Sequence, residues 1–165
     1  MNINEEKLNR LGEFMSDRGY KLSLAESMPA GFFTSIWSLQ TEAGNYLQGS
    51  IVCYAEDVKI NVLNVPNSLI KQYSAESIEV TESMLEGLKI LIPADIHIAV
   101  TGKAFSGCED NNNTSAGDVF LCISFQNVLK SLKIHCNSRN AAEVFIESFN
   151  ASLDLLESIL KADSK

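Results

Sequence analysis

The stretch SLAESMPAGFF (residues 23–33) places a serine where an apolar, strand-like run passes into a helix-like run. The alternation at residues 21–25 predicts the strand, and residues 30–40 predict the helix. Several hydrolases present a nucleophile at such a turn, where the backbone N–H groups of the first helical turn can stabilise an oxyanion. However, serine is a favoured N-cap and Pro29 suits a first helical turn. The simpler interpretation of Ser27 is therefore a helix cap.

Helices and strands continue to alternate along the rest of the chain. Further helices are expected at 3–18, 56–65, 66–72, 74–91 and 140–161, further strands at 49–55 and 95–102, and a hairpin at 118–136 that turns at Gln126-Asn127. This pattern predicts an α/β fold. We expect a single three-layer domain over residues 1–165, with a mostly parallel or mixed sheet, a β-hairpin and flanking helices.

The composition limits the class of partner. The 165 residues carry a formal net charge of −8, from 13 Lys and Arg against 21 Asp and Glu, and 45% are hydrophobic. Nucleic-acid binding depends on clustered cations, so we expect no nucleic-acid partner. The polar N-terminus does not resemble a signal peptide, and no apolar run reaches the length of a membrane span. We therefore expect a cytoplasmic protein with no membrane partner.

The cysteines and histidines do not indicate a metal site. None of the four cysteines belongs to a C-x-x-C pair, so we expect no metal and no cofactor. His97 and His135 lie in strand patterns without an acid at a useful spacing. Both are interpreted as structural, which argues against a Ser-His-Asp triad. The cysteines are Cys53, Cys108, Cys122 and Cys136, and we expect Cys53 and Cys122 to lie in the core.

Three polar segments follow predicted strands, and they contain Ser27, Lys59 and Thr101. Ligands of open α/β sheets bind outside the carboxyl ends of the strands. If these strands are parallel neighbours, Ser27 and Lys59 come together at one edge. An exposed lysine is the simpler interpretation of Lys59. It could act as a general base only if burial lowered its pKa.

Taken in order, these segments resemble the CinA C-terminal domain family, the nicotinamide-nucleotide amidases, over nearly the whole chain. The family's Ala-Glu-Ser-Cys-Thr-Gly-Gly corresponds to AESMPAG (25–31), and its Tyr-Ser-Asn-x-x-Lys to YAEDVK (54–59). Its Thr-Gly-Ile-Ala-Gly-Pro corresponds to TGKAFS (101–106), and its Gly-x-Val strand to GDVFLCI (117–123). An arginine before the last helix corresponds to Arg139.

This resemblance implies an amidase that converts the carboxamide of nicotinamide mononucleotide to the acid and ammonia. Ser27 would be the nucleophile and Lys59 its base. Backbone N–H groups near Met28, Ala30 and Gly31 would hold the oxyanion. The implied substrate-binding residues are Glu26, Gly31, Tyr54, Thr101, Gly102, Lys103 and Arg139, of which Tyr54 and Thr101 would position the substrate and Arg139 or Lys103 would meet its phosphate.

The chain departs from the family motifs at Met28-Pro29-Ala30 and at Phe105-Ser106, and it places Glu56 and Asp57 where the family has an asparagine. Proline removes one backbone N–H from the turn, and the acids oppose an anionic nucleotide. These changes predict reduced or lost activity. The alternatives are a non-catalytic nucleotide-binding or regulatory module and a structural subunit with a filled pocket.

An apolar cluster near the predicted turn also bears on assembly. Phe32, Phe33 and Trp37 look exposed, and such a cluster could form a symmetric contact. We therefore expect a homo-oligomer. The alternative is that the cluster is buried within one chain.

Overall fold

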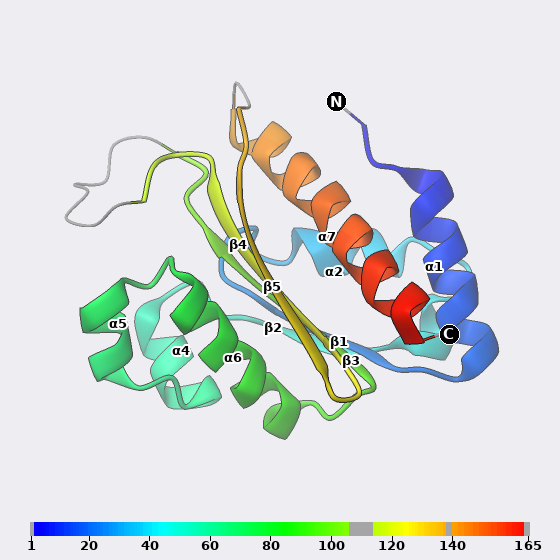
Figure 1. Ribbon diagram of the computed structural model, residues 1–165, viewed down its shortest axis with the longest axis horizontal. Helices are drawn as coiled ribbons and strands as arrows, with labels where there is room; N and C mark the ends of the chain where they lie inside the picture. Colours follow the sequence, from blue (N-terminus) through cyan, green and yellow to red (C-terminus); the bar gives the residue numbers. More distant parts are fainter. Residues whose placement is uncertain (1, 106–113, 138–139, 164–165) are drawn as a thin grey trace.

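The computed structural model describes residues 2–105, 114–137 and 140–163, and these form one layered α/β unit (Figure 1). The elements in chain order are α1 (Glu5–Arg18), β1 (Leu22–Glu26), α2 (Phe32–Ser38), α3 (Ala43–Tyr46), β2 (Leu47–Val52), α4 (Glu56–Leu63), α5 (Asn67–Tyr73), α6 (Ile78–Leu91), β3 (Ile96–Gly102), β4 (Asp118–Phe125), β5 (Val128–His135) and α7 (Ala141–Asp163).

The five strands form one open, mixed sheet in the order β2-β1-β3-β4-β5. Strand β1 pairs in parallel with β2 and β3, whereas β4 and β5 continue the sheet in antiparallel fashion. Helices α1, α2 and α7 cover one face, and α4, α5 and α6 cover the other (Figure 1). The predicted three-layer α/β fold with a mixed sheet and a hairpin is confirmed.

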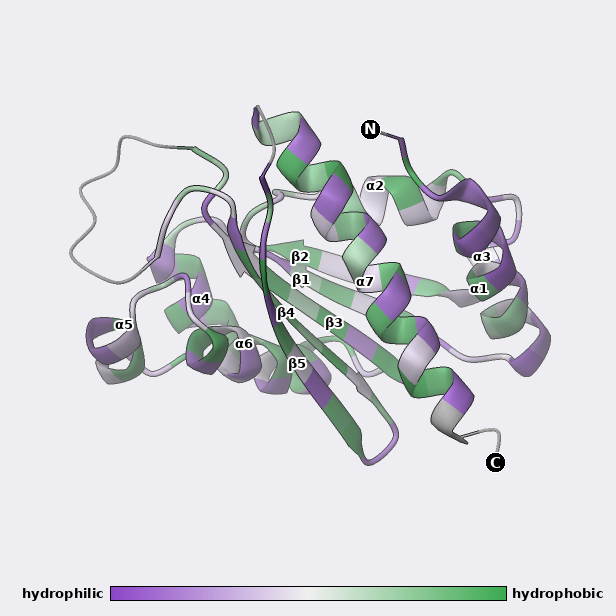
Figure 2. Cartoon of the chain, turned by 45° about the horizontal axis from the view of Figure 1, so that its top comes forward, coloured by the Kyte–Doolittle hydropathy of each residue, from purple (hydrophilic) through white to green (hydrophobic). Residues whose placement is uncertain are grey.

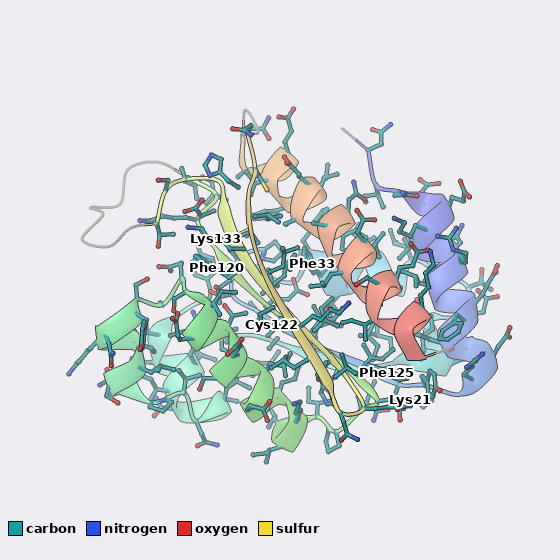
Figure 3. All side chains as sticks on the ribbon, viewed as in Figure 1. Lys21, Phe33, Phe120, Cys122, Phe125 and Lys133 are labelled. Carbon is teal, nitrogen blue, oxygen red and sulfur yellow. The ribbon has the colours of Figure 1, made fainter. Side chains whose placement is uncertain are left out.

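The central strands are apolar throughout because both faces of the sheet are covered. Every residue of β1 and of β4 is buried. Side chains alternate between two cores: Leu24 packs toward α2 and α7, whereas Ala25, Ala99 and Cys122 pack toward α6. Figure 2 shows the complementary pattern on α7, where hydrophobic and hydrophilic residues recur along the helix. In Figure 3, Phe33 and Cys122 are examples from the two cores.

Helix α4 is held by a close approach to α6. A Cβ added to Gly87 of α6 would lie 2.0 Å from the carbonyl oxygen of Leu63, at the end of α4. Glycine is therefore needed there, because any side chain would push the two helices apart. This contact matters for the site because α4 carries Lys59.

The boundaries differ from the prediction around β2. This strand runs from Leu47 to Val52, not 49–55, and the short helix α3 before it was not predicted. Tyr46 explains the difference: its ring packs against Trp37 with centroids 5.8 Å apart, and its hydroxyl donates to the Trp37 carbonyl at 2.9 Å. A tertiary contact thus overrides the local pattern.

The aromatic cluster expected at a symmetric contact is inside the chain. Phe33 and Trp37 are fully buried, and their ring centroids lie 5.1 and 6.0 Å from that of Phe149. Phe32 is partly buried against Phe145, at 5.8 Å. The expectation of exposure was wrong, and the alternative of burial within one chain is correct. Self-association stays a prediction, now without this basis.

None of the helices in the described part of the chain is both long enough and apolar enough to cross a membrane.

Candidate active site

Ser27 and Lys59 form a buried pair at the carboxyl edge of the parallel strands. Lys59 Nζ lies 2.9 Å from Ser27 Oγ, and only 1% of Lys59 and 5% of Ser27 is exposed. Ser27 directly follows β1, and Lys59 reaches back from α4 toward the end of β2. The predicted juxtaposition is confirmed, whereas the interpretation of Lys59 as an exposed lysine is wrong.

Lys59 has two further partners, the carbonyl oxygens of Cys53 at 2.9 Å and Tyr54 at 3.2 Å. Burial lowers the pKa of Lys59 below its usual 10.5, although Cys53, Glu76 and Glu56 pull it in the opposite direction. A neutral amine fits this geometry. Lys59 Nζ donates to both carbonyls and to Ser27 Oγ in this geometry, whereas a neutral amine would keep the two bonds to the carbonyls and accept the Ser27 hydroxyl hydrogen with its lone pair.

The turn after Ser27 is longer than predicted, because α2 begins only at Phe32 with Gly31 as its N-cap residue. Ser27 is therefore not the helix cap, and Pro29, which follows a cis peptide bond from Met28, precedes the helix. Ala30 and Gly31 both have left-handed backbones, with φ of 59° and 98°.

The N–H groups expected to hold an oxyanion are mostly engaged. The Ala30 N–H donates to the Ser27 carbonyl at 2.9 Å, and the Gly31 N–H donates to the Glu26 carboxylate at 2.9 Å. The expectation for these two groups was wrong. The Met28 N–H has no hydrogen-bond partner among the described residues and directly follows Ser27, the candidate nucleophile. It is the remaining candidate donor.

Glu26 caps α2 and is not among the residues that line the cavity beside Ser27. Its carboxylate accepts from the N–H groups of Gly31, Phe33 and Thr34 at 2.8 to 3.1 Å, and from the Thr34 hydroxyl at 2.6 Å. The side chain is fully buried. A carboxylate at a helix N-terminus is favoured by the free N–H groups and by the helix dipole. The implied substrate-binding role of Glu26 is thus replaced by a structural one.

A cavity of about 310 Å³ opens beside Ser27. This volume suits a small-molecule ligand. It also argues against a structural subunit with a filled pocket. The predicted substrate-binding and catalytic residues at its wall are Ser27, Tyr54, Gly102 and Lys103. Met28 and Phe105, which the sequence marked as departures from the family motifs, also line it, and the residues that the sequence interpretation missed are Glu76 and Ala104.

Thr101 and Gly102 face opposite sides of the sheet. Thr101 is fully buried, and its Oγ1 lies 2.7 Å from Oγ1 of Thr81 on α6, so it does not line the cavity. A Cβ on Gly102 would come within 2.7 Å of both the Asp118 carbonyl oxygen and Met28 Cε. The substrate-positioning role of Thr101 is therefore not supported, whereas Gly102 lies at the cavity. Arg139 lies outside the described residues.

A second polar cluster lies at the start of β4. Asp118 accepts from His135 at 2.8 Å and from Lys133 at 3.0 Å. These bonds help to hold the pKa of Asp118 low against the effect of burial. Lys133 also lies 5.3 Å from the ring centre of Phe120, and both are labelled in Figure 3. The expectation that His135 has no acidic neighbour was wrong.

This cluster does not contain Ser27, and His97 is buried in β3, so neither histidine forms a triad with the candidate nucleophile. Within the described ranges, no group of three or more His, Cys, Asp or Glu side chains is arranged to hold a metal ion.

Comparison with known proteins identifies the family of this chain. Residues 4–160 match the CinA C-terminal domain. The chain belongs to this family. A relative from Bacillus cytotoxicus, which carries the name competence-damage inducible protein, is 30% identical over 114 residues, or 69% of this chain. A relative of the same name from Streptococcus pyogenes serotype M49 is 29% identical over 87% of the chain.

These curated relatives are much longer than the CinA domain itself, and the chain spans 27% and 34% of their lengths. Solved structures match over nearly the whole length of both chains. Competence damage-inducible protein A from Klebsiella pneumoniae superposes with a TM-score of 0.89 at 25% identity, covering 97% of this chain and 98% of that one. A CinA superfamily protein from Escherichia coli gives a TM-score of 0.86 at 21% identity, covering 96% and 99%. The second likeness concerns the fold alone.

Proposed function

We propose that this CinA domain is a serine amidohydrolase that converts the carboxamide of nicotinamide mononucleotide to the acid and ammonia. The observation that supports the proposal best is the buried Ser27–Lys59 pair at the wall of a ligand-sized cavity. A lysine with a lowered pKa beside a serine hydroxyl is a known arrangement for nucleophilic catalysis. The choice of nicotinamide mononucleotide as substrate rests on the resemblance of the motifs. The geometry of the pair supports nucleophilic attack by a serine with a lysine as base.

In the proposed reaction, neutral Lys59 takes the proton of the Ser27 hydroxyl as Oγ attacks the amide carbon. The resulting ammonium then gives a proton to the leaving nitrogen, so ammonia departs and an ester to Ser27 remains. Water attacks this ester, with Lys59 again accepting a proton, and releases the acid and the free serine. The carbonyls of Cys53 and Tyr54 hold the amine in place through both steps.

Stabilisation of the oxyanion would come from the Met28 N–H. Loss of one such donor costs on the order of 10²–10³ in rate in a well-studied hydrolase. A site with a single backbone donor is therefore expected to be slow. This agrees with the expectation of reduced activity that follows from the changed motif at residues 28–30.

The test is an ammonia-release assay with nicotinamide mononucleotide on wild-type protein and two serine variants. Ser27→Ala should abolish release, whereas Ser35→Ala, which changes an exposed serine of α2, should not. Release that persists in a folded Ser27→Ala protein would rule out Ser27 as the nucleophile.

The second candidate function is a non-catalytic nucleotide-binding module. It is favoured by the engagement of the Ala30 and Gly31 N–H groups within the turn, which leaves few donors for an oxyanion. Thermal-shift measurements with pyridine nucleotides separate the two candidates. A ligand that raises Tm but yields no ammonia would support the binding module.

A further inference from the structure

We propose that Glu76 is a specificity-determining residue of the cavity, and that it selects a carboxamide carrying a positive charge over an uncharged one. The inference rests on the proposed function only for the carboxamide of the ligand. The preference for a positively charged ligand is tested separately. Glu76 lines the same cavity as Ser27, although it lies 49 residues further along the chain (76 − 27 = 49).

Hydrogen bonds hold the backbone at Glu76, so its side chain starts from a defined position at the cavity wall. The Glu76 carbonyl oxygen accepts from the hydroxyls of Ser74 at 3.2 Å and Thr114 at 3.3 Å. The next residue, Ser77, caps α6 by accepting from the Val80 N–H at 3.3 Å. The Ser77 carbonyl in turn accepts from Thr81 at 2.6 Å, and Thr81 bonds to β3 through Thr101.

The carboxylate itself is available to a ligand. No described residue donates a hydrogen bond to it or forms an ion pair with it, and the residue is only partly exposed. The negative charge of Glu76 also acts on Lys59, since it raises the pKa of Lys59 against the larger effect of burial. A partly buried carboxylate without a fixed partner, facing a cavity, favours a cationic ligand there.

Two aromatic rings at the cavity favour the same charge. Tyr54 and Phe105 line its wall, and they are 62% and 60% exposed. The face of an aromatic ring attracts cations through its quadrupole. Lys103 also lines the cavity and brings a positive charge to the same wall. Glu76 accounts for recognition of the cation.

Nicotinamide and N1-methylnicotinamide provide a matched pair of probes. Both carry the same aromatic carboxamide, and they differ by one methyl group and one positive charge. Binding of each is measured by calorimetry on the Ser27→Ala protein, so that turnover cannot consume the ligand. We expect the cation to bind about tenfold more tightly, which corresponds to about 1.4 kcal/mol.

The decisive comparison adds Glu76→Gln to this protein, which removes the charge at almost constant size. The two affinities should then agree within about twofold. Glu79→Gln, an exposed acid in the first turn of the same helix, is the control and should leave the tenfold preference unchanged. Circular dichroism and Tm establish that each variant is folded.

Three outcomes would overturn the inference: equal binding of the two probes, no binding of either, or an unchanged preference after Glu76→Gln. Failure of the proposed function looks different. In that case wild-type protein releases no ammonia, while the charge preference and its dependence on Glu76 remain.

Discussion

Replacement of Lys59 by methionine tests the central pair through stability as well as activity. Methionine keeps the length of the buried side chain but removes the amine that bridges Ser27 and the carbonyls of Cys53 and Tyr54. A buried polar group left without its partner costs about 1–3 kcal/mol. At strongly alkaline pH, where Lys59 is neutral in both states, the variant should be less stable than wild type by about this amount.

The difference in stability between wild type and the Lys59→Met variant should become smaller as the pH falls. Burial lowers the folded-state pKa of Lys59 below 10.5, so the unfolded chain binds one more proton between the folded pKa and 10.5. In that window the stability of wild type falls with decreasing pH by up to about 1.4 kcal/mol per pH unit. The methionine variant lacks this dependence, and other titrating groups cancel in the comparison.

The assay is urea unfolding of both proteins at intervals from about pH 7 to about pH 12, with ammonia release measured at the lower pH values. Loss of the general base should lower the rate by about 10²–10⁴. Lys71→Met, which changes an exposed lysine of α5, is the control and should follow wild type at every pH. Parallel stability curves for wild type and Lys59→Met would refute the argument that burial favours the neutral amine.

Three further substitutions test the surroundings of the pair, each by urea unfolding. Ala30→Gly should raise the free energy of unfolding by about 0.5–1 kcal/mol because it relieves a left-handed alanine, whereas Ala151→Gly within α7 should lower it by a similar amount. Gly102→Ala should lower it by about 1–3 kcal/mol because the new Cβ meets the Asp118 carbonyl, whereas Gly44→Ala, with open space around it, should have little effect. Glu26→Gln should lower the free energy of unfolding by about 1–3 kcal/mol, because the amide accepts through only one oxygen and carries no charge at the α2 N-terminus. Unchanged stability would contradict the capping role.

Much of the site followed from two sequence rules. Periodicity located the strands, and the rule that ligands bind at the carboxyl ends of parallel strands predicted that Ser27 and Lys59 lie together. The face of β3 on which Thr101 lies could also have been predicted from the sequence. Alternate residues of a strand face opposite ways, so Thr101 shares the α6 face with Ala99, while Gly102 does not.

Other parts of the site could not be predicted because they depend on tertiary structure. The capping role of Glu26 requires the left-handed turn at Ala30 and Gly31, which delays the start of α2 and aims its free N–H groups at the carboxylate. The place of Glu76 at the cavity depends on hydroxyl contacts that join its backbone to Thr114 and α6 to β3. Neither arrangement has a periodic signature in the sequence.

The capping role of Glu26 changes what the Ala-Glu-Ser triplet can be used to diagnose. Glu26 caps the N-terminus of α2, and the fold needs this cap whether or not the neighbouring serine performs chemistry. A homologue without a serine at position 27 would still need the glutamate to cap α2. The glutamate is therefore no marker of amidase chemistry, and the joint presence of a serine and a lysine at positions 27 and 59 is the sharper criterion.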